Sequence, residues 1–199
     1  RSNMNKTKIL FFLCLLFSII LLGRALMANE NRDLIHMTLK DGLVVIETRP
    51  DLAPKHVVQI KQLIGEGKYD GVVFHRVIEG FMAQTGDVKF GNSNLESYDL
   101  QRAGTGGSDY PNLKAEFSSV NHVRGTLSMA RASDPNSADS QFFICLADAP
   151  WLDGEYTIWG QVIEGMENVD KIKKGEGNNG AVVGEPDIII SLKLKSEKE

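Results

Sequence analysis

Hydrophobic positions fall into short blocks along the chain, and turn residues separate the blocks. Blocks rich in β-branched and aromatic side chains predict strands, and they occupy residues 36–39, 43–48, 72–77, 125–130, 141–146, 156–163 and 187–194. Asp41 and Gly42, between the first two blocks, are a strong hairpin turn signal. Many short strands favour a mainly β domain over a doubly wound sheet.

Two other blocks have helical spacing. Pro54 stands where the first turn of a helix would begin, and the first turn is where a helix tolerates proline. Gly65 can end the helix. The apolar face expected between them consists of Val57, Val58, Ile60, Leu63 and Ile64. A second helix is predicted over residues 166–173. These elements fit a closed antiparallel barrel with a helix over each end, whereas the polar stretch from Lys89 to Glu116 predicts a long functional or mobile loop.

The first 28 residues have a different character. Lys6 and Lys8 precede an apolar run over residues 9–22, and small residues follow it, which is the layout of a secretory signal peptide. The run is shorter than the roughly 20 residues that a membrane-spanning helix needs. We therefore expect a cleaved signal within residues 1–28, with an uncleaved membrane anchor as the alternative, and one domain over residues 29–199. The segment before Met4 is interpreted as a cloning remnant, and the expected location is the periplasm or cell envelope.

Composition and charge narrow the function further. The chain has 199 residues, of which 42% are hydrophobic and 24% charged, as in an ordinary single soluble domain. Removal of residues 1–28 takes away four basic residues and no acidic one, so the net charge changes from −4 to −8. Such a domain lacks the basic face that nucleic acid binding requires. Cys145 would then be the remaining cysteine, which excludes an internal disulfide. The histidines have no metal-ligand spacing, and we expect a monomer without metal or cofactor.

The stretch FHRVIEGFMAQTGD, residues 74–87, combines a cation with apolar neighbours. Arg76 lies near Phe81 and Met82, and Gln84 follows closely. Such an arrangement is poorly suited to hydrolysis, but it suits holding an uncharged ring while polarising the amide beside it. Phe74 and Arg76 are two residues apart on a predicted strand, so we expect both on one face.

Rotation about an Xaa-Pro bond is a reaction that this stretch could catalyse. The peptide bond has a rotation barrier of about 18–20 kcal/mol, and no bond breaks, so the reaction needs no nucleophile or metal. A cation aimed at the imide nitrogen would weaken the amide resonance, and apolar walls would hold the ring and exclude water. Arg76 is the candidate cation, with a solvent-facing strand arginine as the alternative. The candidate walls, with simple core residues as the alternative, are Phe81, Met82, Phe143 and Leu152.

Other side chains extend the candidate site. Gln84 could bond Arg76 or a substrate carbonyl, or be a polar strand-edge residue, and Gln141 has the same two interpretations. Trp151 either covers the core or offers its indole N–H to a ligand. Tyr156 either donates its hydroxyl to a substrate carbonyl or only begins a strand. His75 is a weaker candidate, for a general base.

Three blocks together resemble the cyclophilin family of peptidyl-prolyl cis-trans isomerases, and they are residues 74–87, SQFFIC at 140–145 and WLDG at 151–154. The resemblance extends from about residue 36 to residue 194. It implies a closed eight-stranded antiparallel barrel capped by two α-helices, with a peptide groove on the outside. It also implies Arg76 as the catalytic arginine and a proline pocket of Phe81, Met82, Phe143 and Leu152. It implies that Gln84, Gln141 and Ala130 contact the bound peptide, and that Trp151 occupies the position associated with cyclosporin binding.

Three residues depart from the family pattern. Thr85 stands where glycine is common, Arg131 where asparagine is frequent, and Tyr156 where many eukaryotic members have histidine. None removes a catalytic group, so we expect activity with altered sequence preference and cyclosporin affinity. The expected function is isomerisation of Xaa-Pro bonds in proline-containing peptides and unfolded exported proteins, as in bacterial envelope-directed members. The alternative is a proline-peptide-binding chaperone or adaptor with little turnover.

Overall fold

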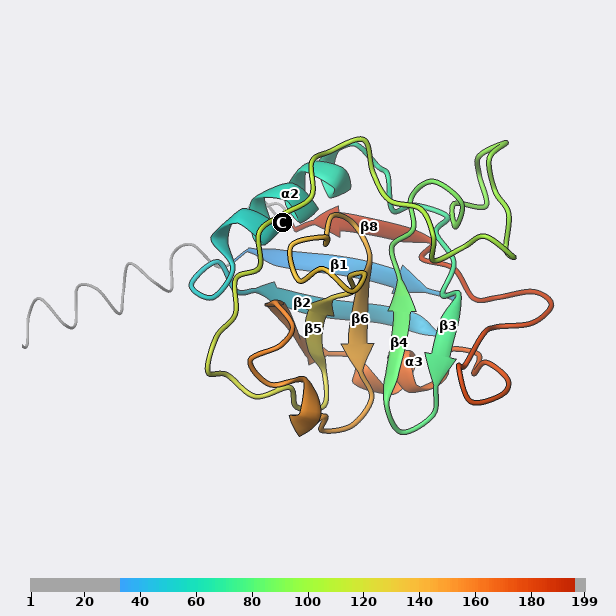
Figure 1. The fold of residues 1–199 in the computed structure, drawn as a ribbon. Helices are drawn as coiled ribbons and strands as arrows, with labels where there is room; N and C mark the ends of the chain where they lie inside the picture. Colours follow the sequence, from blue (N-terminus) through green and yellow to red (C-terminus); the bar gives the residue numbers. More distant parts are fainter. Residues whose placement is uncertain (1–32, 196–199) are drawn as a thin grey trace, which may run out of the picture. The chain divides into compact units, whose positions relative to one another are not determined.

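The computed structural model describes residues 33–195 (Figure 1). The predicted signal peptide, the predicted anchor, and residues 29–32 and 196–199 of the predicted domain lie outside this range. Within it, no helix is both long and apolar enough to cross a membrane.

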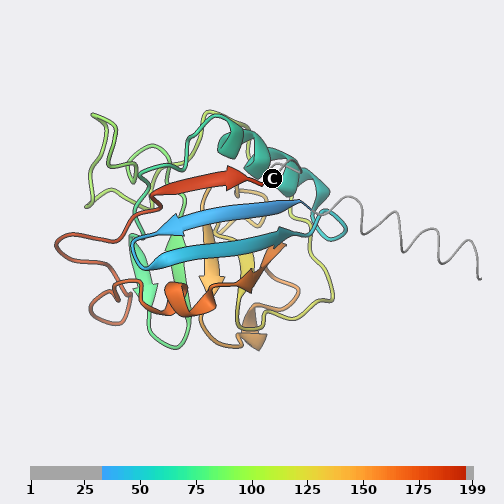
Figure 2. The ribbon, with the colours of Figure 1, turned by 180° about the vertical axis from the view of Figure 1, so that it is seen from behind.

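Eight strands of the described range form one antiparallel sheet in the order β3-β4-β6-β5-β7-β2-β1-β8. Their bounds are β1 Leu34–Leu39, β2 Gly42–Thr48, β3 Arg76–Ile78, β4 Met82–Thr85, β5 Thr126–Met129, β6 Phe142–Cys145, β7 Ile158–Glu164 and β8 Ser191–Leu194. The sheet curls, so that β3 to β6 cross in front of β1, β2 and β8 (Figure 1), and the latter three are nearest in the reverse view (Figure 2). The domain is therefore mainly β, as predicted.

The sheet is a curled half-barrel, and the predicted closed barrel is wrong. Strands β3 and β8 are its two edges and do not pair with each other. Irregular backbone lies between them: Val73 and Ile188 form an isolated bridge, and the Phe74 amide donates to the Asp187 carbonyl at 2.8 Å. The Val73 amide bonds the Gly91 carbonyl instead, and the Val73 carbonyl accepts from the Thr85 hydroxyl. These groups are then unavailable for a regular ladder.

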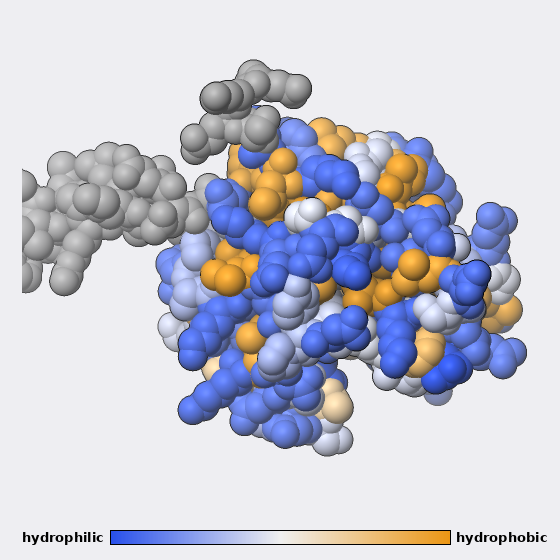
Figure 3. Space-filling view, turned by 90° about the horizontal axis from the view of Figure 1, so that it is seen from above, coloured by the Kyte–Doolittle hydropathy of each residue, from blue (hydrophilic) through white to orange (hydrophobic). Residues whose placement is uncertain are grey.

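The two helices begin where the sequence predicts. Helix α2, Pro54–Gly65, has proline in its first turn, and α3, Met166–Asp170, is shorter than expected. The face of α2 that is buried includes Val57, Ile60 and Leu63, but Val58 is 66% exposed and does not belong to it. In the view from above, hydrophilic residues cover much of the surface and hydrophobic ones form separate patches (Figure 3).

Strand predictions differ from the structure mainly around β3 and β4. Residues 72–75 are irregular, so β3 begins only at Arg76. Phe74 is fully buried in the main core and Arg76 is partly exposed, which contradicts the expected shared face. The sequence does not predict strand β4, because its four residues Met82–Thr85 include only one β-branched side chain and no aromatic one.

Two hydrophobic clusters lie on opposite faces of the sheet around β4 and β6. The main core contains Phe142 and Trp159, whose rings meet edge to face with centroids 5.2 Å apart. A smaller second cluster contains Met82, Phe143 and Cys145, with Leu152 from the 3₁₀ turn Pro150–Leu152. Because successive strand side chains point to opposite faces, the sheet presents this second cluster away from the main core. The candidate site stands on it.

Candidate active site

Strand alternation brings the candidate residues to the outer face of the sheet. On β4, Met82 and Gln84 point outward while Ala83 belongs to the main core. On β6, Phe143 points outward, and it pairs with Gln84 of the neighbouring strand. Arg76 of β3 pairs with Gln84 from the other side. Three adjacent strands therefore place a cation, an amide and an aromatic ring side by side.

A small pocket of about 120 Å³ opens on this face. Its lining consists of Arg76, Phe81, Met82, Gln84, Ala130, Arg131, Phe143, Leu152 and Tyr156. Met82, Phe143 and Leu152 are buried, so the walls are fixed by packing, and Phe81 is half-buried at the rim. The structure thus brings together eight of the ten residues that the sequence predicts for the site.

Arg76 is held at the pocket by neutral hydrogen-bond acceptors. Its Nε donates to the Asn179 carbonyl at 2.7 Å, and its Nη1 donates to Gln84 Oε1 at 3.3 Å. No ion pair involves Arg76 within residues 33–195. Its positive charge is oriented but not neutralised, which leaves it available to a ligand.

A chain of amides continues from Gln84. Its Nε2 donates to Gln141 Oε1 at 3.2 Å, and Gln141 Nε2 donates to the carbonyls of Gly104 and Gly106 at 3.0 and 2.7 Å. Gln141 itself does not line the small pocket but lines a neighbouring one of about 440 Å³. Its position supports Gln84, and its predicted contact with substrate stays a prediction.

Aromatic side chains surround the pocket edge to face. Phe143 meets Tyr156 with ring centroids 6.0 Å apart, and Phe81 meets Trp151 at 5.4 Å. Trp151 is 61% exposed and stands beside the pocket, outside its lining. Tyr156 precedes β7 and lines the pocket, so it does more than begin a strand.

Arg131 lines the pocket, whereas the resemblance predicts only a charge near the groove. Its guanidinium lies over the Tyr156 ring, 4.4 Å from the centroid, and donates to the backbone carbonyls of Ala132 and Glu155. The sequence feature that could have indicated this position was the positive charge of Arg131 where the family often has asparagine. The Asn179 carbonyl had none, because it reaches Arg76 from 103 residues away along the chain.

A Ser-His-Asp arrangement, in which Ser128 and His122 are buried and Asp153 is half-buried, lies behind the Phe143 wall of the pocket and is not predicted by the sequence. His122 has Nε2 2.9 Å from Ser128 Oγ and Nδ1 3.1 Å from Asp153 Oδ1, and burial lowers the His122 pKa. Ser128 is fully buried and donates to the Thr157 carbonyl, so no substrate carbonyl can reach its hydroxyl. The His122 ring stacks on Phe143 at 6.3 Å, which makes the cluster a support for the pocket wall. Residues 33–195 hold no group of three or more acidic, histidine or cysteine side chains that fits a metal ion.

Comparison with known proteins gives a consistent picture. Residues 34–194 match the family model described as cyclophilin type peptidyl-prolyl cis-trans isomerase/CLD. A probable peptidyl-prolyl cis-trans isomerase of Brucella abortus (strain 2308) is 58% identical over 171 residues, 85% of this chain and 86% of that protein. Peptidyl-prolyl cis-trans isomerase A of Dickeya dadantii (strain 3937) is 35% identical over 168 residues, 79% of this chain and 82% of that protein.

Solved structures agree in fold. Cyclophilin AquaCyp293 from Hirschia baltica superposes with a TM-score of 0.69 at 27% identity, covering 84% of this chain and 75% of that one. A Cryptosporidium parvum cyclophilin type isomerase, crystallised in the presence of the dipeptide Ala-Pro, gives a TM-score of 0.67 at 27% identity, covering 82% and 99%.

Proposed function

The chain belongs to the cyclophilin-type peptidyl-prolyl cis-trans isomerases, and we propose that it catalyses rotation about Xaa-Pro bonds in exported proteins through Arg76 and the pocket beside it. It is an isomerase of this class by family membership. The roles of individual residues, the class of client and the cellular location are the proposal.

The observation that carries the proposal is the pairing of an unneutralised guanidinium with a small apolar pocket. Arg76 lines the pocket together with the buried walls Met82, Phe143 and Leu152. A pocket of about 120 Å³ suits one small ring and no larger group. When a proline ring fills the pocket, Arg76 lies beside the imide nitrogen of that proline.

Catalysis follows from stabilising the twisted amide. In the planar amide the nitrogen lone pair is delocalised, and in the twisted state it is localised on nitrogen. Arg76 donates a hydrogen bond toward that lone pair, so it stabilises the twisted state more than either planar isomer. Gln84 keeps the guanidinium in this direction, and no bond breaks at any step.

The remaining residues hold the peptide on either side of the bond. The proline ring sits among Phe81, Met82, Phe143 and Leu152, where water is excluded and the electrostatic interaction with Arg76 is strengthened. The Tyr156 hydroxyl donates to a substrate carbonyl. Ala130, Gln141 and Trp151 contact the chain beyond the proline.

The direct test is a protease-coupled isomerisation assay on a tetrapeptide that contains Ala-Pro. Acceleration of the slow phase above the uncatalysed rate supports the proposal, because a chaperone or adaptor that only binds proline peptides would leave that rate unchanged. Binding of the same peptide without acceleration would favour the chaperone alternative and reject the enzymatic one.

The proposed role in export has its own test. In cell fractionation of a native host, the protein should be found in the periplasm or envelope fraction, and N-terminal sequencing should show a start near residue 29. A purely cytoplasmic protein that retains the apolar segment would contradict this part and leave the isomerase activity untouched.

A further inference from the structure

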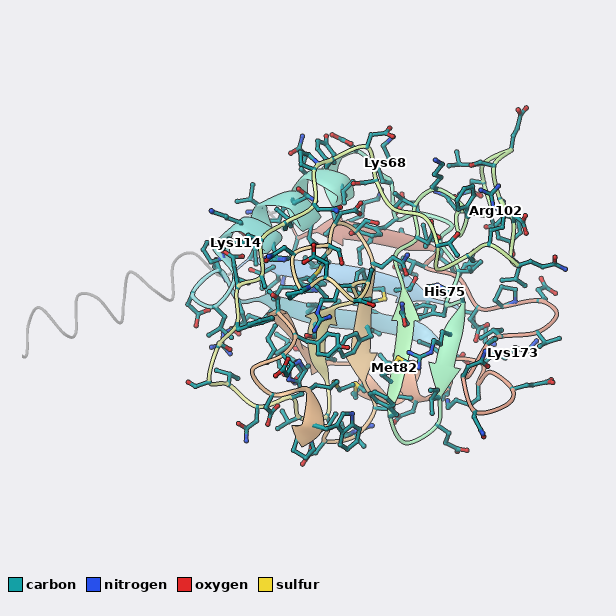
Figure 4. The ribbon with its side chains drawn as sticks, viewed as in Figure 1. Lys68, His75, Met82, Arg102, Lys114 and Lys173 are labelled. Carbon is teal, nitrogen blue, oxygen red and sulfur yellow. The ribbon has the colours of Figure 1, made fainter. Side chains whose placement is uncertain are left out.

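A large hollow adjoins the proline pocket at Arg76 and Gln84, which line both. Its volume is about 900 Å³, against about 120 Å³ for the proline pocket. The loop over residues 100–105 forms one wall and the loop over residues 179–184 forms another. Figure 1 shows both loop regions projecting past β3 on the same side of the sheet, and Figure 4 labels Arg102 on the first loop and Lys173 in the segment that leads to the second.

The lining of this hollow is almost free of charge. Its apolar contributions include Leu100, Val182 and Val183, and among its side chains only Arg76 is charged at neutral pH. His75 lies at the hollow with 8% of its surface exposed, and burial lowers its pKa to about 4, against the opposing effect of Asp87. The imidazole is therefore neutral in the range where the enzyme would work.

Both walls are fixed to the framework of the domain. The amides of Gly104 and Gly106 each donate to Asp87 Oδ2 at 2.8 Å. On the other side, the Val77 amide donates to the Gly180 carbonyl at 2.8 Å, and the Val182 amide donates to the His75 carbonyl at 3.0 Å. A ligand entering here would find the walls already in place and would lose little affinity to ordering them.

We propose that this hollow receives the part of the substrate peptide that flanks the proline, and that it selects a large apolar side chain there. The inference rests on the proposed function, because the occupant is the same peptide. Arg76 and Gln84 form the ridge shared by the two cavities, so a chain whose proline fills the small pocket passes the rim of the hollow. Apart from Arg76 the walls carry no charge, and half-buried Leu100 and exposed Val183 favour a leucine or phenylalanine over a charged or hydroxylated residue.

The test compares peptides that carry Leu or Ser at each position from two before to three after the proline. At one of these positions the wild type should favour Leu by about tenfold in kcat/KM, as partial burial of one leucine side chain predicts. The difference should lie mainly in KM, because the side chain is bound equally well in the planar and twisted states. Leu100→Ser and Val183→Ser should each reduce the preference to about threefold or less.

Leu95→Ser is the matched control. Leu95 lies on the same long loop, is 47% exposed and does not line the hollow, so this variant should keep the full preference. All variants should turn over a short Ala-Pro reference peptide at the wild-type rate. If the wild type isomerises that reference but shows no Leu preference, or if the preference survives in both hollow variants, the inference is wrong and the proposed function stands. Failure on the reference peptide itself would reject the proposed function.

Discussion

Arg76 and Gln84 face each other across β3 and β4, with Arg76 Nη1 3.3 Å from Gln84 Oε1. Because Gln84 is held in turn by Gln141, and Gln141 by two backbone carbonyls, the direction of the guanidinium is set by a chain of neutral groups. A carboxylate in place of Gln84 would orient Arg76 equally well but would neutralise its charge. Neutral partners therefore orient the Arg76 guanidinium and leave its positive charge intact.

Replacing Arg76 with lysine should lower kcat/KM by at least about 100-fold, the effect typical of losing a donor aimed at the transition state. Lysine keeps a positive charge but lacks the planar fork that bonds Asn179 and Gln84 at the same time. The free energy of unfolding should change by about 1 kcal/mol or less, since the side chain is partly exposed. The isomerisation assay and urea unfolding measure the two quantities.

The control for Arg76 is Arg102→Ala, on an exposed loop side chain that does not line the pocket. It should keep the activity on the short reference peptide. Equal activity of Arg76→Lys and wild type would remove Arg76 from the mechanism.

Shortening the rim aromatic in Phe81→Ala should raise KM by about tenfold or more, through lost contact with the proline ring. Phe81 is half-buried, so its main loss is the pocket wall and its packing on Trp151. Phe117→Ala removes a phenylalanine that is 44% exposed and away from the pocket, and should leave KM unchanged. An unchanged KM in Phe81→Ala would show that this ring does not contact the substrate.

Cyclosporin should bind with micromolar or tighter affinity and change the emission of Trp151. The chain has two tryptophans, and Trp159 is fully buried in the main core while Trp151 is 61% exposed. The fluorescence change should therefore disappear in Trp151→Phe and persist in Trp159→Phe, provided that the latter folds by circular dichroism. No change in the wild type at saturating drug would count against the site.

Acid should destabilise the fold through His75. Burial lowers the His75 pKa from its ordinary value of 6.5, which applies to the unfolded chain, to about 4 in the folded protein. Between pH 4 and 6.5 the unfolded chain therefore binds a proton that the folded chain does not. This contribution to stability is complete above pH 6.5 and is lost as the pH falls toward 4, by roughly 3 kcal/mol. Urea unfolding of His75→Gln across this interval should show a smaller loss, with the rest due in part to His56 and His122, whose pKa values burial also lowers. Parallel curves for variant and wild type would assign the acid effect to other groups.

Two glycine-to-alanine substitutions should act in opposite directions. Gly65 ends α2 with open space around it, so Gly65→Ala should stabilise the domain by about 0.5–1 kcal/mol without changing activity. A Cβ on Gly175 would overlap the Gly180 carbonyl oxygen, so Gly175→Ala should displace the loop that presents Asn179 to Arg76. It should cost about 1–3 kcal/mol and lower kcat. Thermal unfolding of both variants measures the change in stability, and the isomerisation assay measures the change in kcat. A fully active Gly175→Ala would show that the loop does not position Arg76.

Much of the fold follows from local patterns. Pro54 begins α2, as expected, because its fixed φ suits the first turn of a helix. The helix ends at Gly65, as expected, but the left-handed glycine is Gly67, two residues later. The hairpin turn is displaced by one residue: Lys40 and Asp41 form it, and Gly42 already pairs with Leu39. The opening between β3 and β8 was not predictable, since it depends on where the Val73 backbone finds partners in distant segments.

The candidate site was predictable as a set of residues but less so as an arrangement. Phe143 and Met82 alternate out of the main core, and only pairing between β4 and β6 shows that they share a second cluster. Arg131 enters the pocket because its guanidinium stacks on Tyr156, a contact that no spacing indicates. The carbonyl that orients Arg76 comes from a loop that the sequence shows only as glycine-rich.

Cys145 lies fully buried in the second cluster, and burial raises the pKa of its thiol to about 12. An alkylating reagent reacts with thiolate, so it cannot modify this sulfur until the floor beneath the proline pocket opens. The rate of labelling therefore reports how often that floor comes apart. Bound peptide should slow it, which would give a readout of site occupancy that requires no turnover.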